Sequence, residues 1–346
     1  MSDKTMRAAV FLGDRRMELR EVPVPRAGAG QVLLRVLACG VCGTDYHIFA
    51  GELTEGVVPP VVLGHEIAAT VEAVGEGVAN VAPGQFCSVD PVLGCGRCPY
   101  CRKGLHNLCA APEVIGYKHN GGFAQYMVVP AEKVIPMSEA AGAAGGVLCE
   151  TLACVLRGYD RLGFTAGGSA MILGAGTVGL LWAQLLSRSP CRRLLQTEIV
   201  PFRRDRAREL GADVVIDPAA GLAEAVRREL GDGPDFIVDA TGDPAAVQQA
   251  FELLAPGGTF MQFGVCPAGS EIRIDPHELF RKEIKVIGSK MPPGTLDRSA
   301  ALIGGGAIAC ERIVTTTVPL AQAAGAVADF NAARDRHIKI AVDPWA

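Results

Sequence analysis

The densest group of chemistry-bearing side chains is a run of four cysteines spaced C-x2-C-x2-C-x7-C: Cys95, Cys98, Cys101 and Cys109. Cysteines separated by two residues can bind the same ion, because a tight turn directs both sulfurs inward, and glycines at 94, 96 and 104 permit such turns. Four thiolates complete a tetrahedral shell and leave no position for a substrate. The loop 94–110 therefore predicts a structural zinc site.

Two other interpretations of the four-cysteine loop are free or redox-active thiols and an iron–sulfur cluster. Bacterial ferredoxins carry proline directly after the last cysteine of their run and a different final spacing, whereas Ala110 follows Cys109 here. The spacing favours zinc over free cysteines as well.

A second set of potential metal ligands lies in three short motifs. Cys42 begins Cys-Gly-Thr-Asp-Tyr-His, His65 and Glu66 stand in Gly-His-Glu, and Glu150 begins Glu-Thr-Leu-Ala. Each residue alone could be an ordinary packing or polar residue. Together they suggest a catalytic zinc, which typically has three protein ligands and an open position.

A glycine-rich turn follows the strand-like segment 171–173 and precedes the helix-like segment 180–186. It consists of Gly174, Ala175, Gly176, Thr177, Val178 and Gly179. In a strand–turn–helix context this G-x-G-x-x-G pattern predicts a dinucleotide site, with backbone close to the pyrophosphate and helix N–H groups directed at it.

Glu198 ends the next strand-like run, 22 residues after Gly176 (198 − 176). A carboxylate there accepts hydrogen bonds from the ribose hydroxyls and repels a 2′-phosphate, which favours NAD over NADP. The alternative is an ordinary surface carboxylate. Arg203 and Arg204 follow closely; an arginine near the ribose can accommodate a 2′-phosphate, or the two belong to a solvated helix face.

The elements that position these residues change in character along the chain. Short apolar runs broken by Gly and Pro predict a β-rich first part, whereas strand-like and helix-like pieces alternate further on and predict a parallel α/β sheet. We expect a first domain of residues 1–154 and 289–346, and a second of 155–288. Strand ends in the second domain add candidate cofactor contacts: Thr241, Phe263, Gly264 and Val265.

Composition excludes several classes of function. The 346 residues carry a formal net charge of -4 without a long run of one sign, which argues against nucleic acid and membrane surfaces as partners. No 18-residue uninterrupted apolar stretch occurs, and the N-terminal segment lacks the apolar core of a signal peptide. Clustered cysteines fit a reducing compartment, so we expect a cytoplasmic protein.

The ordered set of motifs resembles the zinc-containing medium-chain dehydrogenases, and most of all the polyol (sorbitol-type) and threonine dehydrogenases. The resemblance covers essentially the whole chain. It implies a GroES-like β-rich catalytic domain and a doubly wound Rossmann domain. It implies Cys42, His65 and Glu66 as catalytic zinc ligands, with Glu150 either ligating or one water away. Cys149 could compete for that role, and Thr151 replaces the proline usual after this glutamate.

The resemblance also implies a reaction. A zinc ion makes a bound alcohol far more acidic, and hydride then passes to the nicotinamide. Thr44 contacts the alcohol oxygen and passes its proton through the cofactor ribose towards His47, whose intrinsic pKa suits that task. His47 could instead be a surface residue or a contact to a cofactor phosphate.

The expected function is therefore oxidation of a sugar alcohol to a ketose by NAD, in a homo-oligomer (tetramer or dimer) with two zinc ions per chain. L-threonine and a vicinal diol of the butanediol type are the nearest alternative substrates. Lys290 and Met291 stand where sorbitol-type enzymes carry Arg and Tyr, which argues against sorbitol itself. A non-enzymatic NAD-binding redox sensor or structural protein is the alternative of a different class.

Overall fold

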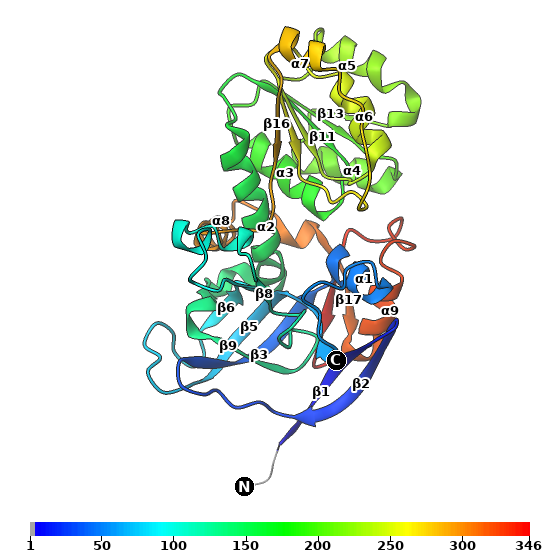
Figure 1. Ribbon diagram of the computed structural model, residues 1–346. Coiled ribbons are helices and arrows are strands. Elements are labelled where there is room, and N and C mark those ends of the chain that lie inside the picture. Colours follow the sequence, from blue (N-terminus) through cyan, green and yellow to red (C-terminus); the bar gives the residue numbers. More distant parts are fainter. Residues whose placement is uncertain (1–3) are drawn as a thin grey trace. The chain divides into compact units, whose positions relative to one another are not determined.

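The computed structural model describes residues 4–346, which divide into two compact units (Figure 1). Of the described residues, the first comprises 4–153 and Pro292–Ala346, and the second Cys154–Met291. The division expected from the sequence lay between 154 and 155 and between 288 and 289. The C-terminal segment therefore returns to the unit in which the chain begins.

The first unit is built on mostly antiparallel sheet, with one parallel pair, β17 and β18. A seven-stranded sheet has the order β10-β6-β5-β3-β18-β17, and β9 also pairs with β3. Its strands are β3 (Gln31–Gly40), β5 (Glu66–Val74), β6 (Phe86–Val89), β9 (Tyr126–Pro130), β10 (Val134–Pro136), β17 (Val314–Pro319) and β18 (Lys339–Asp343). A smaller sheet has the order β2-β1-β4 and consists of β1 (Thr5–Gly13), β2 (Arg16–Pro23) and β4 (Val61–Val62).

Strand β3 shows why this sheet forms. Val32, Leu34 and Val36 are fully buried and alternate with less buried residues, the two-residue period of a strand with one face on a core. The strand also runs at the centre of the sheet, where Gly40 pairs with Glu66 of β5 and with Ala341 of β18. The end of β3 thus brings together the segments that carry the metal-ligand motifs.

Short helices and a two-stranded ribbon complete the first unit. They include α1 (Gly43–Ala50), α8 (Leu296–Gly304), α9 (Ala323–Ala328), β7 (Val92–Leu93), β8 (Glu113–Val114) and the single-turn helices η1 (Cys101–Lys103) and η2 (His106–Leu108). The four-cysteine loop lies between β7 and β8, which pair with each other.

Helix α2 (Gly142–Leu162) begins in a run of alanine and glycine and carries Glu150 and Thr151. The segment Glu139–Leu162 is long and apolar enough, by length and composition, to cross a membrane. However, 72% of its most apolar window is buried within the protein, as in the core helix of a globular fold.

The second unit is a parallel sheet of six strands in the order β13-β12-β11-β14-β15-β16, as the alternating pattern predicted. The strands are β11 (Ser169–Leu173), β12 (Arg193–Thr197), β13 (Val214–Ile216), β14 (Phe236–Asp239), β15 (Thr259–Gln262) and β16 (Lys285–Gly288). The connecting helices include α3 (Thr177–Ser187), α4 (Pro201–Glu209), α5 (Leu222–Leu230), α6 (Pro244–Glu252) and α7 (Pro276–Lys282) (Figure 1).

The strand order of this sheet reverses next to β11, the first strand of the unit. Strands β12 and β13 lie on one side of it, and β14, β15 and β16 lie on the other. Such a switch point leaves a crevice at the carboxyl ends of the strands, where ligands of doubly wound sheets bind. The glycine-rich turn follows β11 directly and therefore lies at that edge.

Candidate catalytic metal centre and cofactor site

Cys42, His65 and Glu66 form one group, in which the potential ligand atoms all lie within 4.8 Å of one another. Cys42 precedes α1, His65 precedes β5 and Glu66 is the first residue of β5. A thiolate, an imidazole and a carboxylate are a donor set that zinc accepts in catalytic sites. The geometry therefore fits the predicted metal centre.

Asp45 holds two of these ligand segments together. Its carboxylate is fully buried and accepts hydrogen bonds from the backbone N–H of Cys42 (2.9 Å) and of Gly64 (3.2 Å). The same carboxylate lies 3.6 Å from Nδ1 of His65. Burial lowers the pKa of His65, but Asp45 and Cys42 together outweigh that effect, and the pKa is raised well above its ordinary value. With Nδ1 directed at Asp45, Nε2 remains for a metal ion.

Glu66 is held from both sides. Lys339, at the start of β18, forms an ion pair with Oε2 of Glu66, and both side chains are almost fully buried. The Thr151 hydroxyl donates a hydrogen bond of 2.7 Å to Oε1. Burial lowers the pKa of Lys339, but Glu66, Cys42 and Asp45 together outweigh burial and raise the pKa above its ordinary value. These two contacts fix the direction of the Glu66 carboxylate without a metal.

Glu150 does not belong to this ligand group within residues 4–346. It is buried in α2, and its neighbour Thr151 is the residue that reaches the centre, through Glu66. The described chain therefore presents three protein donors, the number typical of a catalytic zinc that keeps an open position.

The two predicted proton-handling residues differ in surroundings. The Thr44 hydroxyl lies 3.7 Å from the Cys42 sulfur, so it is adjacent to the ligand group. His47 lies one turn further along α1 and is 42% exposed; its Nδ1 lies 2.6 Å from the Glu52 carboxylate. Glu52 therefore occupies one of the two ring nitrogens, and Nε2 is the one left to exchange a proton with other groups.

The four cysteines of the loop form the second ligand group, with all sulfurs within 4.8 Å of one another. Backbone N–H groups point at the sulfurs: that of Cys98 donates to Cys95 and that of Cys101 donates to Cys98, each at 3.4 Å. The hydrogen bond from Cys101 is the main cause that lowers the pKa of Cys98 to about 6. Backbone donors that stabilise thiolates fit a closed metal site.

The glycine-rich turn has the geometry that phosphate binding requires. Gly174 has a φ of 88°, and a β-carbon there would lie 2.9 Å from the Thr241 methyl group. A β-carbon at Gly179 would overlap the carbonyl oxygen of Gly174, so only glycine allows α3 to pack this closely. Thr177 and Val178 form the first turn of α3, whose N–H groups have no partner within the helix.

Glu198 follows β12 and folds its carboxylate against the glycine-rich turn. It is 7% exposed, and it accepts hydrogen bonds from the backbone N–H of Ala175 (2.7 Å) and of Val200 (2.9 Å). The carboxylate thus lies beside the turn at the ligand edge of the sheet, where the dinucleotide-binding pattern predicts it.

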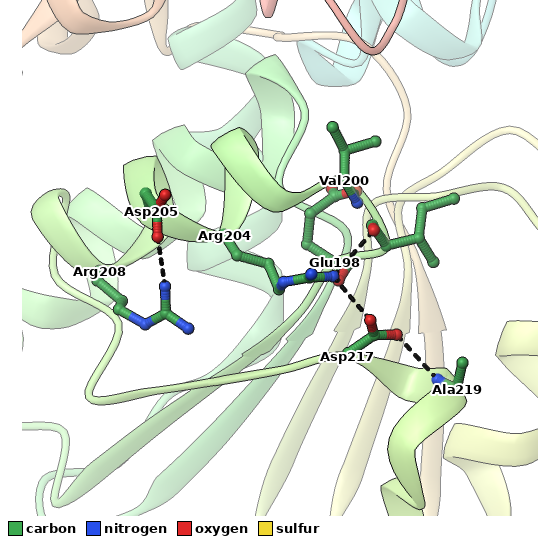
Figure 2. A network of polar contacts seen from close by, with 8 residues as sticks. Glu198, Val200, Arg204, Asp205, Arg208, Asp217 and Ala219 are labelled. Atoms are coloured by element: carbon green, nitrogen blue, oxygen red, sulfur yellow. Dashed lines mark hydrogen bonds and ion pairs between the residues drawn. The ribbon is translucent and has the colours of Figure 1, made fainter.

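The two arginines after Glu198 have separate surroundings, so the interpretation as one solvated helix face was wrong. An Nη atom of Arg203 is the nearest group to a β-carbon built on Gly176, at 3.8 Å, so its guanidinium faces the glycine-rich turn. The Arg204 side chain is 19% exposed and turns to the strand ends instead, where it pairs with Asp217 (Figure 2).

Asp239 organises the remaining strand ends. It is fully buried and accepts hydrogen bonds from the Thr241 hydroxyl (2.6 Å) and from the Gln262 amide (2.6 Å). A β-carbon at Gly264 would lie 2.6 Å from this carboxylate, so the loop after β15 approaches closely.

The two predicted cofactor contacts that flank Gly264 differ. Phe263 packs its ring edge-on against Trp182, with centroids 5.7 Å apart. Val265 is 81% exposed. An exposed valine at the ligand edge of the sheet is free to contact a cofactor, whereas the Phe263 ring is engaged in packing.

Comparison with known families agrees with this geometry. Residues 28–139 match the alcohol dehydrogenase GroES-like domain, and residues 177–302 match the zinc-binding dehydrogenase family. D-altritol 5-dehydrogenase from Agrobacterium fabrum is 34% identical over 326 residues, which is 92% of this chain and 94% of that protein. The chain belongs to the zinc-containing medium-chain alcohol dehydrogenases.

Other relatives of this dehydrogenase carry different names. L-threonine 3-dehydrogenase from Pyrococcus horikoshii is 34% identical over 259 residues, 72% of this chain and 73% of that protein. D-arabinitol dehydrogenase 1 from Uromyces fabae is 31% identical over 344 residues, 98% of this chain and 97% of that protein.

Solved structures show the same fold with different cofactors. A zinc-binding dehydrogenase from Sinorhizobium meliloti bound to NADP is 34% identical, with a TM-score of 0.94 over 99% of this chain and 100% of that one. An alcohol dehydrogenase from Escherichia coli complexed with NADH is 27% identical, with a TM-score of 0.90 over 98% of this chain and 99% of that one. This dehydrogenase is therefore a zinc-binding oxidoreductase that uses a nicotinamide cofactor.

One residue of the metal centre has no counterpart in the sequence-based prediction. The Tyr117 ring lies edge-on to His65, with centroids 6.0 Å apart and planes at 82°. Burial raises the pKa of its phenol to about 12, so the hydroxyl stays protonated as a donor beside the ligand group. No motif marks Tyr117, because only the fold brings residue 117 to residue 65.

Proposed function

We propose that this dehydrogenase oxidises a secondary alcohol of a sugar alcohol to a ketose, with NAD as the acceptor. The observation that carries the proposal is the buried group of Cys42, His65 and Glu66, whose carboxylate is fixed by Lys339 and Thr151. Relatives named for D-altritol and D-arabinitol, each similar over more than nine tenths of this chain, support a polyol substrate.

We assign each part of the chain a role in this reaction. Zinc, when bound, supplies Lewis-acid chemistry, and the dinucleotide accepts the hydrogen and electron pair removed from the alcohol. The Thr44 hydroxyl, adjacent to Cys42, takes the proton of the substrate hydroxyl, and His47 receives it at Nε2. A second zinc in the four-cysteine loop has no open position and stabilises the fold only.

The NAD preference is supported by Glu198, whose buried carboxylate faces the glycine-rich turn. A fixed negative charge at the ribose disfavours a 2′-phosphate. The relative bound to NADP is the main argument against this preference. We therefore expect the catalytic efficiency with NAD to exceed that with NADP by at least about tenfold, as one charge contact of ~1.4 kcal/mol would give.

L-threonine is the second candidate substrate, because L-threonine 3-dehydrogenases are also similar to this chain. The deciding experiment measures NADH and NADPH formation by the purified protein with four- to six-carbon polyols, L-threonine and 2,3-butanediol. Turnover of polyols with NAD is the expected result. Turnover of threonine or butanediol alone would move the substrate assignment, and no turnover with two bound zinc ions would favour a non-enzymatic NAD-binding protein.

The setting of the enzyme is also part of the proposal. The cysteines of residues 4–346 form no disulfide with one another, which suits a reducing compartment, and we propose that the enzyme acts in the cytoplasm. We propose a homo-oligomer, tetramer or dimer, on the family resemblance. Mass measurement in solution tests the assembly, and fractionation of the source cells tests the compartment.

A further inference from the structure

Arg204 forms the centre of a polar network at the carboxyl ends of two neighbouring strands (Figure 2). One of its Nη atoms donates hydrogen bonds to the carbonyl oxygens of Glu198 (3.0 Å) and Ile199 (2.8 Å), which directly follow β12. The same nitrogen contacts the Asp217 carboxylate at 2.9 Å. The guanidinium therefore joins the backbone of the ribose-binding carboxylate to the end of β13.

Asp217 is itself fixed in this position. It follows β13 directly, and its other carboxylate oxygen accepts a hydrogen bond of 3.1 Å from the backbone N–H of Ala219, at the start of the helical turn η5 (Pro218–Ala220). The carboxylate is 36% exposed and the Arg204 side chain 19% exposed, so the pair is largely shielded from solvent. Dissolved salt screens a partly buried ion pair of this kind less than it screens an ion pair at an open surface.

The position of this pair matters for the choice of cofactor. Glu198 and Asp217 end adjacent parallel strands, so both carboxylates lie at the edge of the sheet where the adenosine ribose binds. Arginine is the side chain best suited to bind a phosphate, because its planar fork of N–H groups matches the phosphate oxygens. A free Arg204 beside the ribose would therefore favour a 2′-phosphate.

We propose that Asp217 is a specificity-determining residue, which excludes NADP by engaging Arg204 and directing its guanidinium to the Glu198 backbone. The inference rests on the proposed NAD preference and deepens it. Specificity then has two components: Glu198 repels a 2′-phosphate, and Asp217 engages a cation at these strand ends, Arg204, that would attract it. Arg204 is a positioning residue in the same network, because it holds the turn that carries Glu198.

The chain offers a matched control one turn away. Arg208 and Asp205 form an ion pair of 2.7 Å on the same helix α4, but both are more than half exposed. They make no contact with Glu198 or Asp217 in the network of Figure 2. Asp205→Asn therefore removes the same charge from the same helix without freeing Arg204.

The test measures dissociation constants of NADH and NADPH by nucleotide fluorescence, at low and at high salt, for the zinc-loaded full-length protein and its variants. Asp217→Asn removes the charge but keeps the side-chain oxygen that accepts from Ala219. We expect NADPH to bind about fivefold more tightly at low salt, as one released arginine–phosphate contact would give, with NADH binding changed less than twofold. The effect should shrink at high salt.

A double-mutant cycle makes the assignment specific to Arg204. Arg204→Met alone should weaken NADH binding without improving NADPH binding, because the Glu198 turn loses its support. In Arg204→Met/Asp217→Asn the gain in NADPH affinity should vanish, since the freed arginine is absent. The same gain in NADPH affinity in the double variant would overturn the proposal. A gain in NADPH affinity in Asp217→Asn no larger than that in Asp205→Asn would also overturn it.

Failure of the NAD preference has a different readout from failure of this inference. The wild-type ratio of the two dissociation constants tests the preference itself. The change of that ratio in Asp217→Asn, relative to Asp205→Asn, tests the role of Asp217 whatever the wild-type ratio is. Unchanged melting temperatures among the variants show that the comparison concerns folded proteins.

Discussion

Lys339 forms a buried ion pair with Glu66, joining the start of β18 to the start of β5 at the metal centre. The two residues are separated by most of the chain, and the return of the C-terminal segment to the first unit is what brings them together. The cation fixes the carboxylate that the metal would bind. It also offsets a negative charge that has almost no access to water.

Lys339→Met should therefore destabilise the protein and weaken the metal centre. Removing one partner of a buried ion pair costs about 3–5 kcal/mol, because the remaining charge is left without compensation. We expect that loss in urea unfolding of the metal-free protein, together with lower zinc occupancy. Thr151→Val, which removes only the hydroxyl on the other Glu66 oxygen, should cost about 1–3 kcal/mol. Equal stability of Lys339→Met and wild type would contradict this account of the pair.

Gly40→Ala should disrupt the same metal centre by steric overlap between the added methyl group and the side chains around it. A β-carbon at Gly40 would overlap Oε2 of Glu66 and lie 2.8 Å from the Val147 side chain and 2.9 Å from that of Lys339. Overpacking of this kind costs about 1–3 kcal/mol, and here the displaced group is a metal ligand. Zinc titration should show weaker binding at one of two sites.

Gly325→Ala is the control for that substitution. It lies in α9 with nothing within 4 Å of the added β-carbon, so it should be neutral or slightly stabilising. If both alanine variants bound zinc like the wild type, the crowding at Gly40 would have no bearing on the metal centre.

Cys98→Ser should remove the loop zinc and leave the other. The thiolate of Cys98 is stabilised by backbone N–H groups, and serine is a poor substitute for it. We expect one zinc per chain by elemental analysis and a melting temperature lower by about 10 °C, since loss of a metal site is among the largest single-residue effects. Retention of two zinc ions would show that the loop is not a zinc site.

Thr44→Val should impair catalysis and not metal binding. Its hydroxyl lies beside Cys42 but is not among the ligands. Loss of a proton-transfer group typically lowers kcat by about 10²–10⁴-fold. Thr54→Val, an exposed threonine in the loop after α1, is the matched control and should keep full activity. A kcat near that of wild type for Thr44→Val would remove Thr44 from the proton path.

The sequence predicted the parts whose information is local. The spacing of Cys95, Cys98, Cys101 and Cys109 and the glycines of the turn after β11 each constrain a few consecutive residues, so pattern and physics agree there. The parallel sheet followed from alternating strand-like and helix-like segments in the same way.

The parts that the sequence did not predict depend on long-range packing. Lys339 contacts Glu66, Tyr117 contacts His65 and Arg204 contacts Asp217. In each pair, the sequence around one residue gives no indication of the other. Glu150 illustrates the converse. The motif around it suggested a residue that either binds the metal or lies one water away from it. In the described chain Glu150 stays outside the ligand group, so only the second alternative agrees with the structure, and its neighbour Thr151 contacts Glu66.

The central claim is that the alcohol is oxidised at the centre of Cys42, His65 and Glu66. The most direct test is the zinc content and the NAD-linked polyol oxidation rate of Cys42→Ala, measured on the same preparation. We predict one zinc per chain, a fold unchanged by circular dichroism, and a rate lower by about a thousandfold or more, because a Lewis-acid metal contributes several kcal/mol to such a reaction. Two zinc ions per chain, or a rate like that of the wild type, would contradict the claim.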